Sequence, residues 1–403
     1  MRNKPITVLF VTIFIDLMGF GIVIPVLPIY ANELGASGTM IGLITASFAI
    51  MQFLFAPFWG GLSDRYGRRP ILLASIGLMG LSYLLLAQAE SLWLLLLSRM
   101  LAGVGAANIS TANAFISDVT PAKDRSKNFG LVGAAFGLGF IFGPPLGGFL
   151  KDHFGMASVG YVSAAMAGGN LLMAYFMLPE SLQTEERSGK KSLFPNPFGE
   201  IIRVLPRKEL SRLILSNFLF LSAFSMMQIT ASLLWKGQFE LSEAEIGYTF
   251  AFVGVTMAIV QGGLIGPFTR WFGEKRLYVV GSLLMALGLA ILPLVPPDYF
   301  VPLELVGLLL ISFGNAFFTP SIFSLISQRA GRREQGKILG LMQSVGSLSR
   351  VVGPFIGGTL YGAFYYLPFL VAAGAMVGVC LFSLYIVRRL APIGDGPLEG
   401  SPG

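Results

Sequence analysis

Charged side chains are scarce in this chain: Lys, Arg, Asp and Glu make up 12% of its 403 residues, against about 25% in an average soluble domain. Such a composition excludes a soluble enzyme, a nucleic-acid-binding protein and a disordered chain, in spite of the net charge of +7. The single cysteine, Cys380, excludes a disulfide framework, and the single histidine, His153, excludes a multi-histidine zinc site. The chain is instead rich in apolar residues, with 54% hydrophobic residues and a mean hydropathy of +0.73.

The apolar residues form long continuous runs, and about 20 such residues cross the roughly 30 Å of a membrane's hydrocarbon layer. Continuous rather than alternating runs predict helices and exclude the strands of a membrane barrel. The first run lacks a small-residue cleavage site, so we interpret it as a retained helix and not as a signal peptide. The sequence predicts an all-α polytopic membrane protein with 12 transmembrane helices at residues 6–30, 39–62, 70–88, 91–115, 127–150, 157–178, 211–235, 246–269, 277–296, 301–325, 336–360 and 364–387.

The longest polar stretch, 179–210, divides these helices six and six. We therefore expect an N-terminal six-helix bundle over 1–178, a cytoplasmic linker over 179–210, a C-terminal six-helix bundle over 211–387 and a disordered cytoplasmic tail over 388–403. Apolar and basic residues alternate between Leu193 and Lys208, which suits both a short helix on the membrane surface and a plain linker.

The basic residues are distributed unevenly between the two sides of the membrane. Of the 28 Lys and Arg residues, 24 fall at one side, and only Lys151 and Lys236 fall at the other. Because cytoplasmic loops carry the excess of Lys and Arg, both termini are predicted to be cytoplasmic. We expect a multi-pass protein of the cytoplasmic (inner) membrane, surrounded by lipids and without a nucleic-acid partner.

The two halves repeat each other. The segment Gly143-Pro-Pro-Leu-Gly-Gly148 recurs as Gly353-Pro-Phe-Ile-Gly-Gly358. Two six-helix halves of the same orientation are typical of a transporter that binds a small molecule between the halves near the membrane midplane.

Three ionisable residues lie well inside the predicted spans: Asp16, Arg99 and Arg350. Each costs about 2.5–3.5 kcal/mol at the centre of a membrane helix, so a function is expected. Burial favours the neutral form of a carboxyl group and a nearby cation favours the charged form. We therefore assign proton coupling to Asp16, tuned by Arg99; a permanent Asp16–Arg99 pair that only stabilises the bundle is the alternative.

Arg350 stands where the repeat has Phe140, so the repeat itself does not require it. A buried guanidinium group indicates an anion, either a carboxylate or phosphate of the substrate or Asp16 across the cavity. In the alternative interpretation it bonds polar neighbours such as Ser349 or Gln343.

Polar and soft side chains within the spans predict the wall of a substrate cavity. These residues are Asn108, Asn113, Asn217, Met226, Gln228, Asn315 and Gln343.

We expect His153 at the surface and Cys380 facing lipid or core. No glycine run precedes a Lys-Ser/Thr pair, so no ATP site and no cofactor is expected, which leaves the proton gradient as the energy source.

Two glycine-containing motifs have a structural interpretation of their own. In the loop from Gly60 to Arg69, the glycines permit close helix contact, and the basic residues hold the chain at the anionic leaflet of the membrane. Asp64, Arg68 and Asp118 can form a charged latch between helices. The alternative interpretation is a solvated turn. The residues assigned to this gating loop are Gly60, Gly61, Asp64, Arg65, Gly67, Arg68, Arg69 and Asp118. In the fifth helix, Gly139, Gly143 and Gly147 form a close-packing face that continues to Gly148, and Pro144 bends the helix.

These motifs resemble the major facilitator superfamily along essentially the whole chain. Gly60–Arg69 resembles its signature loop, Leu95–Arg99 its fourth-helix motif, and Gly139–Gly148 its antiporter motif. Gly19–Pro28 resembles the twelve-helix drug–proton antiporters, in particular the tetracycline-efflux-like branch. That branch has acidic residues on helices three and nine, whereas Ser82 stands on helix three here and residues 277–296 contain none. The resemblance therefore implies the family, but by itself implies neither tetracycline as the substrate nor that branch's proton route.

The resemblance implies a monomeric, non-enzymatic transporter that exports amphiphilic small molecules or drugs in exchange for protons, by alternating access. It also implies that the gating loop steadies the outward-open state by contacting the start of helix eleven, and that the fifth-helix motif prevents leakage. The alternative function is a carrier or exchanger of an endogenous organic anion or lipid that uses Arg350. A membrane scaffold or an intramembrane enzyme is disfavoured because no nucleophile–base set is visible.

Overall fold

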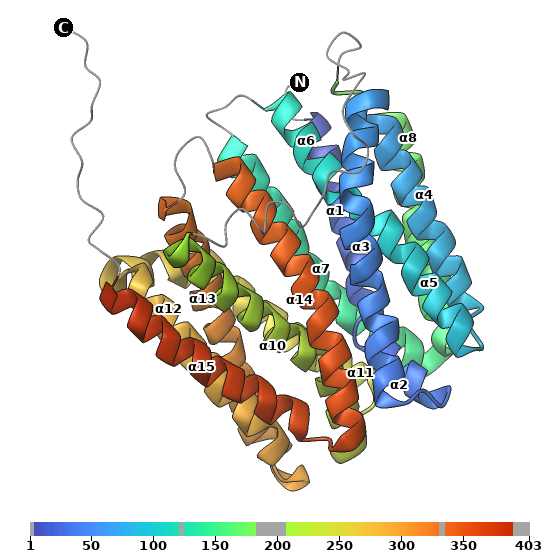
Figure 1. Ribbon diagram of the computed structural model, residues 1–403. Coiled ribbons are helices and arrows are strands. Elements are labelled where there is room, and N and C mark those ends of the chain that lie inside the picture. Colours follow the sequence, from blue (N-terminus) through green and yellow to red (C-terminus); the bar gives the residue numbers. More distant parts are fainter. Residues whose placement is uncertain (1–3, 121–124, 183–206, 330–334, 390–403) are drawn as a thin grey trace, which may run out of the picture.

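The computed structural model describes residues 4–120, 125–182, 207–329 and 335–389, and the regular elements in these ranges are helical (Figure 1). The first half contains α1 (Lys4–Val23), α2 (Val26–Glu33), α3 (Gly38–Tyr66), α4 (Arg68–Ala87), α5 (Leu92–Gly105), the short η1 (Ala106–Asn108), α6 (Ile109–Val119), α7 (Arg125–Phe154) and α8 (Met156–Met177). The second half contains α10 (Lys208–Gln238), α11 (Glu243–Ile259), η4 (Val260–Leu264), α12 (Ile265–Ile291), η5 (Leu292–Leu294), η6 (Pro297–Tyr299), η7 (Phe300–Glu304), α13 (Leu305–Arg329), α14 (Gln335–Ala363) and α15 (Leu367–Arg389).

Nine helical stretches of the described residues are long and apolar enough to cross a membrane. The longest, Glu243–Leu294, contains two helices, because Gly273 interrupts it with a left-handed backbone (φ 73°, ψ 154°). Two further helices, α7 and α14, have 30 and 29 residues. The predicted all-helical membrane fold is confirmed; that all twelve expected spans cross the bilayer stays a prediction.

Several predicted boundaries differ from the structure. The expected helix 6–30 is divided into α1 and α2 at Pro25, because proline lacks an N–H group and disfavours a helical conformation of the residue before it. The second bundle begins at Lys208 rather than at 211, and α15 continues to Arg389. Most of the linker, at 183–206, and the tail from 390 lie outside the described residues.

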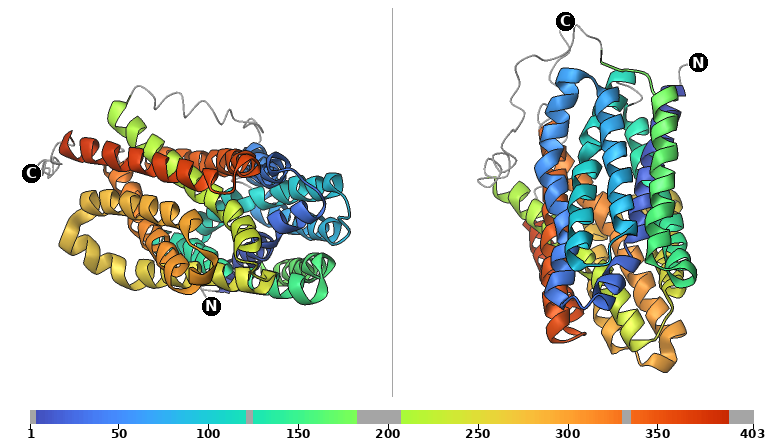
Figure 2. Two further views of the ribbon diagram at one scale, coloured as in Figure 1. Left: turned by 90° about the horizontal axis from the view of Figure 1, so that it is seen from below. Right: turned by 90° about the vertical axis from the view of Figure 1, so that its right-hand side faces the viewer.

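The helices form two groups that converge at one end of the molecule, which we call the distal end (Figures 1 and 2). The start of α1 and the end of α15 lie at the opposite, terminal end. At the distal end the backbones of the halves touch: Gly38 of α3 lies against Gly358 of α14, and Gly148 of α7 lies against Glu243 of α11. Small residues allow this approach.

Each half has an apolar core of its own, and much of the outer surface is apolar as well. In the second half, the rings of Phe220 and Phe318 stack with centroids 3.8 Å apart. Large side chains such as Trp93, Phe176 and Trp271 are more than 70% exposed. This outward exposure of aromatic side chains suits a protein whose helices face lipid instead of water.

Candidate functional site

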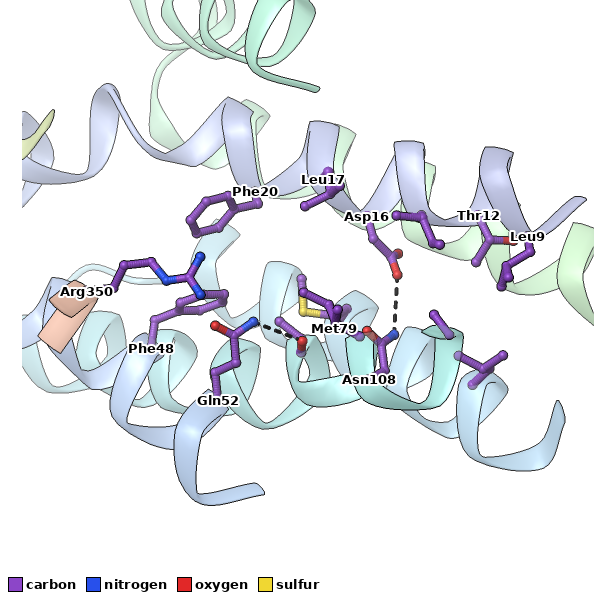
Figure 3. Close-up of a pocket in the computed structure, with 15 residues that line it drawn as sticks. Leu9, Thr12, Asp16, Leu17, Phe20, Phe48, Gln52, Met79, Asn108 and Arg350 are labelled. Carbon is purple, nitrogen blue, oxygen red and sulfur yellow. Dashed lines mark hydrogen bonds between the residues drawn. The ribbon is translucent and has the colours of Figure 1, made fainter. Parts of the chain in front are cut away.

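A cavity lies between the halves and is lined by two of the three predicted intramembrane charges (Figure 3). Its walls include Asp16 and Phe20 from α1, Phe48 and Gln52 from α3, Asn108 from η1 and Arg350 from α14. Figure 3 shows Asp16 and Arg350 directed into this space from different halves of the chain. The structure therefore brings together residues separated by more than 300 positions in sequence.

Asp16 is held by two amide side chains. Its Oδ1 accepts a hydrogen bond from Asn170 Nδ2 at 3.0 Å, and its Oδ2 accepts one from Asn108 Nδ2 at 3.5 Å. Asn108 also donates to Ser75 Oγ at 2.8 Å, and Asn170 to the carbonyl oxygen of Thr12 at 3.1 Å. Both donors are neutral, so they orient the carboxyl group without compensating its charge.

The alternative of a permanent Asp16–Arg99 pair is wrong for this structure. Among the described residues the two side chains form no ion pair, and the Nε of Arg99 contacts only Ser98 Oγ, at 3.5 Å. Arg99 lies on the wall of a different cavity, whereas α8 and η1 supply the partners of Asp16. Sequence position placed both residues at similar depth but could not indicate which way each points.

The second cavity is lined by Arg99 from α5, Gln228 from α10 and Arg350 from α14, among others. Phe20, Phe48 and Arg350 line both cavities, and the rings of Phe20 and Phe48 stack with centroids 5.0 Å apart. The aromatic pair and Arg350 therefore separate the Asp16 cavity from the Arg99 cavity.

Among the described residues, neither arginine has an acidic partner; Arg99 is buried and Arg350 is half-buried. In the described parts of the chain, no carboxylate pairs with either one, and Arg99 Nη2 and Arg350 Nε have no hydrogen-bond acceptor. Arg350 does not bond Ser349, whose hydroxyl group donates to the carbonyl oxygens of Phe218 and Val345. Two guanidinium groups that line one cavity, each with an unsatisfied nitrogen, can bind an anion.

The remaining residues predicted to line the substrate cavity divide into two groups. Asn108 lines the first cavity and Gln228 the second, and Gln228 also borders a third cavity between α7, α10 and α11. Met226 instead packs against Gly357 of α14, because a close helix contact covers it. Three others likewise do not line these three cavities: Asn113, Asn217 and Asn315. The side chain of Gln343 lies outside the described part of the chain.

Sequence reasoning missed Asn170, which holds Asp16, and several residues that line the cavities. Asn170 stands in the middle of an expected span, so its amide group was a detectable signal. Gln52, whose amide donates to the carbonyl oxygen of Ala106 at 3.1 Å, gave the same signal. Phe20 and Phe48 gave none, because the chain has 34 Phe residues.

The gating loop turns sharply between α3 and α4. Gly67 has φ 104°, a left-handed conformation that favours glycine. The guanidinium group of Arg68 contacts Asp64 at 2.5 Å, Asp118 at 3.2 Å and Ser63 at 2.7 Å. The three residues of the predicted latch therefore meet within the first half.

Neighbouring residues of the loop anchor it further. Arg69 donates to the carbonyl oxygen of Tyr175, and Arg65 lies over the ring of Tyr66. Glu180, which the sequence did not indicate, accepts hydrogen bonds from the backbone N–H groups of Arg68 and Arg69 at the N-terminus of α4. The expected close packing at Gly60 is absent, since an added Cβ there meets only Ser110 Oγ, at 3.6 Å. The expected contact with the start of helix eleven involves side chains outside the described residues.

The fifth-helix motif packs α7 against α1. A Cβ on Gly143 would lie 2.8 Å from Gly21, one on Gly139 2.9 Å from Leu17, and one on Gly147 would overlap the carbonyl oxygen of Ile22. Gly148 and the carbonyl group of Pro144 contact α11 of the other half instead. In the repeat, Gly353 of α14 packs against Ser222 of α10, so corresponding helices pair in both halves.

His153 and Cys380 stand apart from the cavities. His153 is exposed and stacks on Phe149 with ring centroids 4.4 Å apart. Cys380 is buried in the second half, next to Val279.

Comparisons with known proteins agree with this architecture. The profile of the Major Facilitator Superfamily matches residues 9–354 and 213–401. The class C tetracycline resistance protein of Escherichia coli is 31% identical over 371 residues, which cover 90% of each chain. Major facilitator superfamily domain-containing protein 10 of Bos taurus is 29% identical, over 97% of this chain and 94% of that protein.

A solved structure is similar in its fold over nearly the full length. The crystal structure of the human organic anion transporter MFSD10 (TETRAN) aligns with a TM-score of 0.70 and 27% identity, over 95% of this chain and 99% of that one. The chain thus belongs to the major facilitator superfamily, a family of transporters and not of enzymes, and it is similar to the tetracycline-efflux proteins within that family.

Proposed function

We propose that this protein exports amphiphilic small molecules across the cytoplasmic membrane in exchange for protons, with Asp16 as the group that binds the proton. The observation that carries this proposal is the carboxyl group of Asp16 on the wall of the cavity between the halves, held by neutral amides alone. Because no cation of the described residues is locked onto it, its charge can change during the cycle. Its tuning by Arg99 then acts through rearrangement of the cavity wall rather than through a permanent pair.

Alternating access follows from the position of the close contacts between the halves. We infer that the terminal end faces the cytoplasm, as the basic residues indicate, so the distal contacts close the outer side. In this state the Asp16 cavity serves the cytoplasmic side. Rocking of the residue 4–182 bundle against the residue 207–389 bundle exposes the cavity to the other side. The Asp64–Arg68–Asp118 latch stabilises one of the two end states of this motion. A monomer is sufficient for the motion.

A second candidate substrate class is favoured by one specific observation, the two arginines without acidic partners among the described residues that line a single cavity. An amphiphilic organic anion suits this cavity, since its carboxylate or phosphate can bond Arg99 and Arg350 while Phe20 and Phe48 contact its apolar part. The similarity to a protein described as an organic anion transporter points the same way.

The test of proton coupling is transport in proteoliposomes with an imposed pH gradient. The Asp16→Asn variant keeps a side chain of similar size but cannot ionise, so gradient-driven transport is expected to fall to the background while substrate binding persists. Asp152→Asn, the same change at an exposed site, is the matched control and should transport normally. Undiminished gradient-driven transport by Asp16→Asn removes Asp16 from the mechanism.

A further inference from the structure

A second carboxyl group is buried in the C-terminal half, away from the cavity of Asp16. Glu304 ends the short turn η7 just before α13 and is 0% exposed. Its Oε1 accepts a hydrogen bond from Nε1 of Trp235, on α10, at 2.5 Å, and Trp235 is also 0% exposed. Within the described residues, Oε2 of Glu304 has no hydrogen-bond partner.

The charged groups of the neighbouring elements are engaged elsewhere or lie at a surface. Lys236, next to Trp235, contacts Glu243 at the start of α11 at 3.3 Å. Glu245 of α11 accepts a hydrogen bond from the backbone of Ser242, and Asp298 of η6 is exposed. On α12, Glu274 accepts hydrogen bonds from Ser324 and Gln328 of α13. The other charged residues of these elements are Lys208, Glu209, Arg212, Arg270, Lys275, Arg276 and Arg329, and none of them forms an ion pair with Glu304.

An ionised carboxylate in this position would be poorly stabilised. A buried anion needs a cation or several hydrogen bonds, and one indole N–H group supplies a single bond. The neutral acid leaves at most one O–H group without a partner, which is a far smaller penalty than an uncompensated charge. Bound to a proton, the side chain keeps its bond to Trp235 and carries no charge.

We propose that Glu304 and Trp235 form a second proton-binding site, located in the C-terminal half near the distal end. Trp235 also lines the third cavity, where α7 of the first half meets α11 of the second. The side chain of Trp235 therefore connects Glu304 to a contact between the halves, where Gly254 of α11 lies against Phe140 of α7. Glu304 holds the proton while the distal end is closed and releases it when opening admits water to Trp235. This inference does not depend on the role proposed for Asp16.

The test uses Trp235 as a local reporter. With Trp59, Trp93 and Trp271 replaced by Phe, the tryptophan fluorescence of the purified full-length protein, excited selectively over that of tyrosine, comes from Trp235 alone. Titration without substrate, between about pH 5 and about pH 9, is expected to change the emission reversibly, because ionisation of the acceptor alters the indole environment. Glu304→Gln should abolish this change, and Glu90→Gln, at an exposed distal site, should retain it. Emission that is constant with pH, or that titrates equally in Glu304→Gln, overturns the proposal.

A second measurement covers the case in which Glu304→Gln does not fold. In the Asp16→Asn background, infrared difference spectra between the acidic and the alkaline end of this titration are expected to show the C=O band of a protonated carboxyl group. Trp235→Phe should shift that band because it removes the hydrogen bond from Trp235 to Glu304. A spectrum without such a band, or with a band that Trp235→Phe leaves in place, contradicts the site. Because this background already lacks the Asp16 carboxyl group, failure of the transport proposal and failure of this one give different results.

Discussion

Arg350 faces both cavities, and its chemistry separates the two candidate substrate classes. It comes from the C-terminal half, whereas Arg99 and Asp16 come from the N-terminal half. A substrate that bonds Arg350 and a residue of the first half contacts both moving parts of the transporter. Its affinity then changes when the halves move, which is the requirement for alternating access.

Replacing Arg350 tests whether Arg99 and Arg350 select anionic substrates. Arg350→Gln is expected to reduce transport of amphiphilic anions by about tenfold or more, since hydrogen bonds to charged groups contribute roughly 1.5–3 kcal/mol. Arg350→Lys keeps the charge but loses the planar fork, so an intermediate effect is expected. Transport of cationic and neutral compounds in the same proteoliposomes provides the control. Anion transport that is the same in all three proteins rules out the anion carrier.

At the scale of elements, close pairing of α7 with α1 positions the first half of the cavity. The face formed by Gly139, Gly143 and Gly147 lets the two backbones touch along that part of α1 that carries Asp16 and Phe20. The equivalent pair, α14 with α10, carries Arg350. Glycines at this contact therefore determine how far the cavity walls stand apart.

A methyl group at Gly147 should disturb this pairing. Gly147→Ala places a Cβ against the carbonyl oxygen of Ile22, and overpacking of this kind destabilises a protein by about 1–3 kcal/mol. The expected result is a lowered midpoint of thermal unfolding in detergent. Gly137→Ala is the matched control on the same helix, because its Cβ has no atom within 4 Å. Equal midpoints of thermal unfolding for the two variants would show that α7 does not require a glycine at position 147.

For the whole molecule, ion pairs at the distal end add to the glycine contacts that join the halves. Glu243 of the second half is 7% exposed and lies 3.9 Å from Lys151 of the first half and 3.3 Å from Lys236 of its own. Lys151 also contacts Glu33 at 2.8 Å. The two lysines assigned to the outer side of the membrane therefore meet at one acidic residue across the junction.

Removing the charge of Glu243 is expected to favour opening of the distal end. Ion pairs near a protein surface contribute about 0.2–1 kcal/mol, so Glu243→Gln should raise the open population by up to about fivefold. Spin labels at Glu90→Cys and Asp298→Cys, in a Cys380→Ala background, report the distance between the halves at this end. Glu240→Gln, at an exposed distal residue, is the control. A distance distribution that Glu243→Gln leaves unchanged contradicts a stabilising role for the cluster.

The helical membrane fold, the repeat of the two halves and the components of the Asp64–Arg68 contact are predictable from the sequence. These properties follow from local patterns: hydropathy over about 20 residues identifies a span, and a spacing of four residues places two side chains on one helix face. The partner of Asp16, in contrast, becomes known from the helix packing: it is Asn170, 154 residues away, and not Arg99. The packing also reveals Glu304 as a buried acid, since burial depends on neighbouring helices. The direction of a side chain on a membrane helix depends on the rotation of that helix against its neighbours, and long-range packing sets that rotation.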